Sequence, residues 1–305
     1  MHPVRIGTRG SPLALAQAEE VKARLVAAHG LSPESVEIVV IAVSGDQIQD
    51  RALAEIGGKG LFTLEIEEGL AEGRIDLAVH SSKDMPTELP AGLYLSAFLP
   101  REDVRDAFLS EKAETLTDLP EGAVVGSASL RRQALIRLIR PDLRVVTFRG
   151  NVQTRLKKLA EGTVDATLLA MAGLNRLGLA HVARSALPLD LFPPAVGQGA
   201  ICIESRTGDS RMDALLLPLN DPDTHAALTA ERAFLKVLDG SCRTPIAGHA
   251  RRQGETLVFD GLIARPDGST AHRVQRTGPF DAPEALGLEA GEALKALAGP
   301  GFLEA

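Results

Sequence analysis

The alternation of short apolar runs with amphipathic segments constrains this chain most, because it indicates an α/β fold. The run at residues 4–7 predicts a strand, and Ser11 and Pro12 then provide an N-cap and a proline suited to the first turn of a helix. Apolar residues continue on one helical stripe up to Gly30, where this helix is expected to end. The next predicted elements are a strand at 36–43, a helix at 61–72 and a strand at 75–80. This order predicts a parallel sheet covered by helices.

The same rhythm begins again after residues 99–101. Strands are predicted at 124–126, 144–148 and 165–170, and helices at 130–140 and 151–160. This repetition predicts a second α/β domain. The prolines and glycines at 193–199 mark its end, and a short apolar strand at 200–204 has little chain with which to build a sheet of its own.

The pattern changes from about Asp221 onward. The predicted order is a helix at 224–238, three strand-like runs at 246–251, 257–264 and 270–276, and a last helix at 283–298. Strands grouped between helices are typical of a small α+β domain. A chain of 305 residues, of which 45% are hydrophobic, is long enough for two or three domains of this kind.

Charge and aromatic content argue against several classes of function. The formal net charge is −7, whereas general binding of nucleic acid needs a basic surface. Trp is absent and there is one Tyr, so the stacking platforms of single-strand binders are missing. Residues 1–5 lead into a strand without the apolar run of a secretion signal, and no window approaches the ~20 apolar residues of a membrane span. We therefore expect a cytoplasmic protein that binds neither nucleic acid nor a membrane.

The chain has two cysteines, Cys202 and Cys242. The seven His show no usable spacing to these cysteines, so we expect no metal site, and a reducing compartment disfavours a disulfide. Cys202 lies in an apolar run and is expected in the core. Cys242 lies in a turn after a helix, without a base nearby in the sequence. By this criterion alone, an inert thiol is the more frequent outcome.

Two loops follow predicted elements of the first domain and contain candidate ligand-binding residues. Lys83 and Asp84 follow the carboxyl end of a predicted parallel strand, where open α/β sheets present ligands, although such a pair can also be a surface ion pair. The glycine-rich segment around Lys59 lacks the Ser or Thr that a Walker phosphate loop needs after its Lys. We interpret it as a hinge or lid in which Lys59 could contact an anion.

Two turns of the second domain concentrate arginines at strand ends. Ser129, Arg131 and Arg132 open a helix directly after a strand, and the segment from Arg149 to Arg155 repeats the arrangement at the next strand end. Backbone N–H groups and guanidinium groups converge there, which is typical of an anion site. A single arginine of this kind would more often be solvated surface. Two such turns at successive strand ends indicate instead a site that binds an anionic ligand.

Taken in order, these segments resemble the hydroxymethylbilane synthase family, also called porphobilinogen deaminases. The matching stretches are 8–14, 57–62, 79–86, 129–132, 149–155, 172–174, 195–200, 230–233 and the turn at Cys242. The resemblance implies three domains: residues 1–99 together with about 200–217, residues 100–199, and residues 218–305. The first two would be α/β domains like those of periplasmic binding proteins, and the third a small α+β domain.

The resemblance also implies the chemistry. A dipyrromethane cofactor would be attached through a thioether to Cys242, so that this thiol serves as an anchor. Porphobilinogen would lose ammonia, four substrate rings would extend the growing oligopyrrole, and hydrolysis would release 1-hydroxymethylbilane. A monomer is implied as well.

The functional residues of the family are carried over where this chain matches the motifs. Asp84 is implied as the catalytic carboxylate. The implied cofactor-binding residues besides Cys242 are Lys83, Ser129, Arg131, Arg132 and Arg155. The implied substrate-binding residues are Arg9, Ser11, Lys59, Phe62, Arg149, Arg176 and Gln198. Charge-assisted hydrogen bonds contribute ~1.5 to 3 kcal/mol each, so several of them can hold an oligopyrrole without an aromatic pocket.

Three positions depart from the family pattern, and two other functions stay open. Glu55 stands where several relatives have Lys, Ala128 where Ser is frequent, and Ser241 where Gly is common. The open alternatives are a solute receptor without catalysis and a different transferase that turns over at Cys242. A stable excess of two pyrrole units in the intact mass would favour the synthase.

Overall fold

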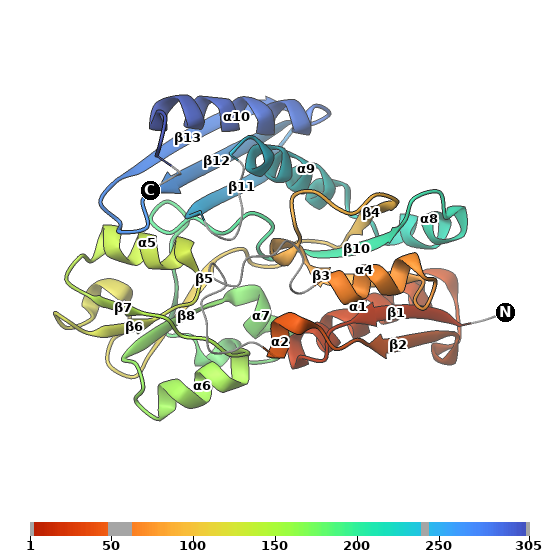
Figure 1. The fold of residues 1–305 in the computed structure, drawn as a ribbon, viewed down its shortest axis with the longest axis horizontal. Coiled ribbons are helices and arrows are strands. Elements are labelled where there is room, and N and C mark those ends of the chain that lie inside the picture. Colours follow the sequence, from red (N-terminus) through yellow and green to blue (C-terminus); the bar gives the residue numbers. More distant parts are fainter. Residues whose placement is uncertain (1–2, 48–62, 239–243, 303–305) are drawn as a thin grey trace. The chain divides into compact units, whose positions relative to one another are not determined.

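The computed structural model describes residues 3–47, 63–238 and 244–302, which form two compact units (Figure 1). Among these residues, the first unit combines 3–47, 63–102 and 199–225, and the second combines 103–198 and 226–302. Both units therefore contain segments that are distant in the sequence.

The first unit contains a five-stranded sheet in the order β2-β1-β3-β10-β4. β1 (Val4–Thr8) pairs in parallel with β2 (Val36–Val40) and with β3 (Leu77–Ser81). β10 (Ile201–Arg206) lies between β3 and β4 (Leu93–Phe98) and is antiparallel to both. The three strands predicted for this sheet, β1, β2 and β3, are parallel as expected, whereas β10 and β4 make the complete sheet mixed. β10 enters from a distant part of the chain, and not through the crossover connection that parallel neighbours need.

Helix α1 (Pro12–His29) begins and ends where the sequence predicts. The hydroxyl group of Ser11 accepts a hydrogen bond from the backbone N–H of Ala14 at 3.3 Å, and a proline occupies the first turn. Gly30 ends the helix with a φ of 60°, a left-handed conformation that glycine adopts at little cost. The capping residues thus set the point at which the chain leaves β1 and enters α1.

Helices cover both faces of this sheet. Successive side chains of a strand point to opposite faces, and in β3 Leu77 and Val79 share a core with α1 and α8 (Ser210–Leu216), whereas Ala78 shares another core with α4 (Leu64–Ala71). A short helix, α2 (Ser44–Gln47), follows β2 in the chain. This packing holds the carboxyl ends of β1 and β3 next to the start of α1.

The second unit contains a sheet in the order β7-β6-β8-β5-β9. β6 (Val124–Gly126) is parallel to β7 (Arg144–Val146) and β8 (Ala166–Ala170), whereas β5 (Asp106–Ser110) is antiparallel to β8 and β9 (Ser185–Ala186). α5 (Leu130–Ile139) packs on one face, and α6 (Val152–Ala160) and α7 (Met171–Arg176) pack on the other. This sheet is also mixed.

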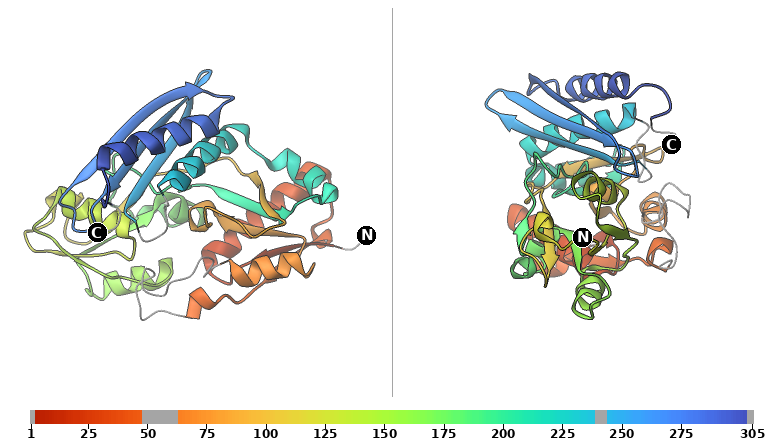
Figure 2. Two further views of the ribbon diagram at one scale, coloured as in Figure 1. Left: turned by 45° about the horizontal axis from the view of Figure 1, so that its top comes forward. Right: turned by 90° about the vertical axis from the view of Figure 1, so that its left-hand side faces the viewer.

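The same unit contains a three-stranded antiparallel sheet made of β11 (Ile246–Gln253), β12 (Thr256–Ala264) and β13 (Ala271–Pro279). Figure 2 shows α9 (Pro222–Val237) and α10 (Pro283–Ala298) side by side on one face of this sheet. Phe234 of α9, Leu286 of α10 and Phe259 of β12 belong to one core cluster. On the opposite face, Leu262 joins the core that includes α5.

The predicted fold class, α/β with a small α+β region at the C-terminal end, is confirmed. Most predicted helices and strands lie within a few residues of their observed bounds, although the strand expected at 36–43 ends at Val40. The sequence did not predict β4, β5, α7 or α8. Across the part of the chain that the structure describes, no helix has the length and apolarity needed to cross a bilayer.

Candidate active site

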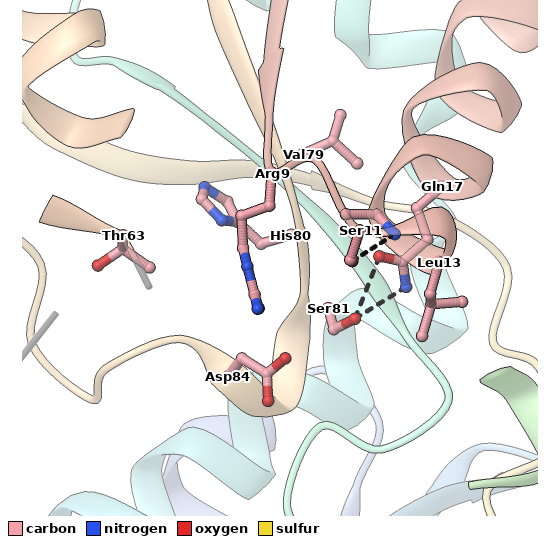
Figure 3. Close-up of a pocket in the computed structure, with 10 residues that line it drawn as sticks. Arg9, Ser11, Leu13, Gln17, Thr63, Val79, His80, Ser81 and Asp84 are labelled. Carbon is pink, nitrogen blue, oxygen red and sulfur yellow. Dashed lines mark hydrogen bonds between the residues drawn. The ribbon is translucent and has the colours of Figure 1, made fainter. Parts of the chain in front are cut away.

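A pocket in the first unit contains Asp84, the residue expected to be catalytic (Figure 3). Asp84 ends a 3₁₀ turn (Ser82–Asp84) that directly follows β3, and Ser11 is the N-cap of α1. We call this site the Asp84 pocket, and it is lined by Arg9, Ser11, Leu13, Ala14, Gln17, Thr63, Val79, His80, Ser81 and Asp84. Three of the predicted site residues, Arg9, Ser11 and Asp84, are therefore brought together.

The polar groups of this pocket are arranged around open space. Figure 3 shows the guanidinium end of Arg9 directed toward the carboxylate of Asp84. Asp84 is exposed, so its carboxylate is accessible to a ligand. On the α1 side, Nε2 of Gln17 donates to Oγ of Ser81 at 2.9 Å, which fixes both side chains in the wall. A cationic ligand group can thus approach Asp84, while Arg9 is placed to attract an anionic one.

Behind this wall lies a buried ionisable cluster that the sequence did not predict. Nε2 of His80 lies 3.1 Å from Oε2 of Glu204, whose side chain is fully buried in β10. Glu67 of α4 is also buried, and burial together with the charge of Glu204 raises its pKa. A glutamate at the end of an otherwise apolar strand was the available signal, since a buried carboxylate needs a partner.

Arg131 and Arg132, predicted to converge at an anion site, are buried and bound to Asp106. Nη2 of Arg131 donates to Oδ2 of Asp106 at 2.7 Å, and Nη1 donates to the carbonyl oxygen of Pro193 at 2.6 Å. Arg132 donates to Oδ1 of Asp106 through Nη2 at 2.7 Å and Nε at 3.1 Å, and its Nη1 donates to the carbonyl oxygen of Leu168 at 3.0 Å. Asp106 is thus the centre of a buried polar network.

The electrostatics of this network follow from its geometry. Burial by itself raises the pKa of Asp106, but the two guanidinium groups overcome that effect and hold the pKa far below its usual value. One carboxylate faces two cations, so the group of three keeps a positive charge. Among the residues that the structure describes, Nε of Arg131 is buried without a hydrogen-bond partner. This atom is a donor to which an acceptor could still bind.

Two further predicted residues contact this network. Nε2 of Gln198 donates to Oδ1 of Asp106 at 2.9 Å and to the carbonyl oxygen of Val104 at 2.8 Å. Ser129 is the N-cap of α5, and its hydroxyl accepts from the backbone N–H of Arg132 at 3.4 Å. Gln198 and Ser129 therefore help to fix the position of the two arginines.

Arg155 lies close to other cations in the second unit. Burial, together with the charges of Arg132 and Arg149, lowers the pKa of Arg155 to about 10. Its Nε donates to the carbonyl oxygen of Gly150 at 2.8 Å. Burial and neighbouring cations destabilise the protonated form of this guanidinium group. An anion that binds next to the group stabilises that form. Arg155 thus has the electrostatic properties of a carboxylate-binding residue.

The remaining predicted residues belong neither to the lining of the Asp84 pocket nor to the network around Asp106. Lys83 precedes Asp84 in the 3₁₀ turn and is half-buried, and Arg176 is the last residue of α7. Lys59, Phe62 and Cys242 lie outside the described residues, as do Glu55 and Ser241. Asp106 was not among the predicted site residues. In the structure it begins β5 (Asp106–Ser110), a strand that the sequence did not predict and whose five residues are all buried.

These observations define an α/β protein with an accessible carboxylate beside a pocket and a surplus of buried guanidinium groups, as expected for binding a carboxylated small molecule. A family model described as "Porphobilinogen deaminase, dipyromethane cofactor binding domain" matches residues 4–214, and one described as "Porphobilinogen deaminase, C-terminal domain" matches residues 225–296. The chain is 58% identical over 297 residues to a porphobilinogen deaminase of Nitrobacter winogradskyi, covering 97% of this chain and 94% of that protein. The chain therefore belongs to the porphobilinogen deaminase family. It is a transferase, and its cofactor is dipyrromethane.

Solved structures of solute-binding proteins are more distant. A periplasmic substrate-binding protein of an ABC transporter from Coxiella burnetii is 17% identical, with a TM-score of 0.45, and the match covers 72% of this chain and 92% of that chain. A putative methionine-binding lipoprotein from Bacillus subtilis is 13% identical, with a TM-score of 0.44 and coverage of 71% and 89%.

Proposed function

We propose that this chain is a hydroxymethylbilane synthase in which Asp84 is the catalytic carboxylate. It deaminates porphobilinogen, joins four substrate rings head to tail on a dipyrromethane primer, and releases 1-hydroxymethylbilane by hydrolysis. Family membership supports the reaction. The observation that carries the residue assignment is the Asp84 pocket, where an exposed carboxylate and the guanidinium group of Arg9 line the same space.

The reaction sets the requirements for the site. The bond between the aminomethyl carbon and the protonated nitrogen of porphobilinogen breaks, and ammonia leaves with the bonding electrons. Positive charge then develops on the pyrrole ring. A carbon–carbon bond then forms between the methylene carbon that ammonia has left and the free α-carbon of the terminal pyrrole of the growing chain, and this attacked carbon loses its proton. The site therefore needs a carboxylate that stabilises a cationic ring and accepts a proton.

Asp84 meets these requirements in the proposed mechanism. Its carboxylate accepts a hydrogen bond from the pyrrole N–H and offsets the charge that develops when ammonia leaves. In the following step it receives the proton that the attacked carbon releases. Arg9 and Ser11, at the carboxyl end of β1 and the start of α1, bind the acetate and propionate groups of the substrate. Lys83, Lys59, Phe62, Arg149 and Arg176 complete the substrate-binding set by family resemblance.

The residues of the second unit fit the cofactor's carboxylates. The buried Nε of Arg131 lacks a partner among the described residues, and Arg155 has a pKa lowered to about 10 by burial and neighbouring cations. Both features favour a bound carboxylate. In this proposal Arg131, Arg132, Arg155, Lys83 and Ser129 hold the cofactor, and Cys242 anchors it. When bound, dipyrromethane supplies the pyrrole carbon to which the first substrate ring is joined.

Localisation, oligomeric state, binding partners and domain boundaries belong to the proposed function as well. We infer a cytoplasmic monomer that binds porphobilinogen and the growing oligopyrrole, and neither nucleic acid nor a membrane. We also infer three domains, with boundaries at residues 1–99 plus about 200–217, 100–199 and 218–305. The net charge of −7 supports the absence of nucleic-acid binding.

Replacement of Asp84 tests the catalytic assignment. Asp84→Asn should fold and contain the cofactor but lose ~10²- to 10⁴-fold in the rate of catalysis, because the carboxamide cannot accept the proton or offset the charge. Asp84→Glu should retain part of the activity. Glu88→Gln, an exposed position four residues along the chain, is the matched control and should behave like the unmodified enzyme. The measurement is single-turnover release of ammonia from porphobilinogen. An Asn variant with nearly the unmodified rate would exclude Asp84 from the chemistry.

A further inference from the structure

Asp106 makes more hydrogen bonds than a simple ion pair requires. Asp106 is fully buried and accepts four hydrogen bonds from three side chains: one from Arg131, two from Arg132 and one from Gln198. Oδ1 accepts three of these bonds and Oδ2 accepts one, so both oxygens of the carboxylate are held. A small rotation of the Asp106 side chain would break bonds to all three partners at once.

The arginines are also held at their other ends. Nη1 of Arg131 is bound to the carbonyl oxygen of Pro193, and Nη1 of Arg132 to that of Leu168. Each guanidinium plane thus has a carboxylate contact and a backbone contact, which together fix its orientation. The guanidinium carbon of Arg131 also lies 5.6 Å from the ring centroid of Phe192. These contacts leave one donor of Arg131, Nε, buried and without a partner in the described part of the chain.

From this arrangement we propose that Asp106 is a positioning residue, which orients Arg131 and Arg132 so that their remaining guanidinium donors meet the carboxylates of the cofactor. The inference rests on the proposed function, because it assumes that these arginines bind the cofactor. It assigns Asp106 no contact with the substrate. Its role is to hold the donors in place before the ligand arrives, so that binding does not have to order two long side chains.

A purely structural role for Asp106 makes a different prediction. If the carboxylate only balances charge inside the fold, any residue that keeps the negative charge should preserve cofactor loading. If Asp106 positions the donors, then moving the carboxylate by one methylene group should impair loading even when the protein stays folded. Asp106→Glu keeps the charge and shifts the carboxylate, and so separates the two roles.

The experiment uses Asp106→Asn, Asp106→Glu and a control, Asp142→Asn. Asp142 forms a pair with Arg140 at 2.6 Å in the same unit, but its side chain is 29% exposed. Each protein is prepared without cofactor and incubated with porphobilinogen. Intact mass follows the rate at which two pyrrole units are added, and thermal unfolding reports whether each variant is folded.

We expect Asp106→Asn to unfold roughly 5 to 15 °C below the unmodified protein, because it leaves two buried cations with less compensation. Asp106→Glu should remain folded at the assay temperature and load the cofactor about tenfold or more slowly, as expected for misplaced charge-assisted bonds. The Asp142→Asn protein should load normally. Normal loading by either Asp106 variant would overturn the positioning role.

The outcome also separates this inference from the proposed function. If the unmodified protein never gains the mass of two pyrrole units, the function itself is wrong. If the unmodified protein and the control both gain this mass and the folded Asp106→Glu protein gains it at the same rate, only the positioning role fails.

Discussion

At the scale of single residues, the most consequential side chains are carboxylates in three different environments. Asp84 is exposed at the edge of a pocket, Asp106 is buried among cations, and Glu67 is buried near another carboxylate, Glu204. The environment decides the role of each group. An exposed carboxylate can take part in chemistry, one that is held by guanidinium groups can orient them, and one that lies near a like charge favours its protonated form.

Glu67 gives a prediction for the pH dependence of stability. Burial raises the pKa of this group above the unfolded value of 4.5. A group with a raised pKa contributes stability that is fully present below its unfolded pKa and is lost as the pH rises through its folded pKa. Glu67→Gln removes this loss, so the variant should unfold at a temperature roughly 2 to 4 °C higher than the unmodified protein at pH 8, and at nearly the same temperature at pH 4.

The measurement is thermal unfolding of both proteins across this pH range. Glu68→Gln is the matched control, because Glu68 is the next residue of α4 and is exposed. It should leave the pH dependence unchanged. The difference in unfolding temperature between Glu67→Gln and the unmodified protein is compared at pH 8 and at pH 4. If the variant gains less at pH 8 than at pH 4, this description of Glu67 is contradicted.

At the scale of elements, the close approach of α9 and α10 depends on glycine. A Cβ atom at Gly287 of α10 would lie 2.0 Å from the carbonyl oxygen of Ala230 in α9, and one at Gly291 would lie 2.7 Å from Cβ of Val237. The two glycines are four residues apart and so lie on one face of α10. The helices can pack this closely because neither position carries a side chain.

Gly287→Ala should therefore destabilise the protein, although alanine favours helices by about 1 kcal/mol over glycine. The contact is with backbone, which cannot move aside easily, and we expect a net loss of about 1 to 3 kcal/mol. Gly69→Ala is the matched control in α4, where the nearest atom to a new Cβ is a side-chain carbon at 3.4 Å. It should be neutral or stabilising. Denaturant unfolding measures both, and equal stabilities of the two variants would contradict the packing argument.

Some elements of the fold were predictable from the sequence and others were not. The bounds of α1 were predictable because Ser11, Pro12 and Gly30 act through local backbone geometry. The direction of β10 was not predictable from its own residues, because strand pairing depends on which distant segment reaches the open edge of β3. In the structure, β10 lies between β3 and β4 in the sheet of the first unit.

The candidate site shows the same division between local and distant information. Asp84 and the arginine turns were found because they follow strands in the sequence. The inward orientation of Arg131 and Arg132 was not foreseen, since it depends on Asp106, which lies 25 and 26 residues away from them in the chain. The buried pair of His80 and Glu204, separated by 124 residues, was missed for the same reason.

At the scale of the whole molecule, the two units contain different charged groups. The first unit contains the Asp84 pocket, and the second contains the buried side chains of Arg131 and Arg132. An acidic protein thus keeps a local surplus of positive charge inside one unit, as a ligand with many carboxylates requires. In this account the covalent anchor at Cys242 keeps the primer attached throughout the cycle of additions.

The mass of the intact purified protein tests this central claim most directly. The unmodified chain of 32.2 kDa should carry a stable excess equal to two pyrrole units. Cys202→Ser should carry the same excess, because Cys202 is fully buried in β10. Cys242→Ser should have the bare mass of its chain, because a hydroxyl group is a much poorer nucleophile than a thiolate. An unmodified protein at its bare mass, or a Cys242→Ser protein that still carries two pyrrole units, would contradict the account.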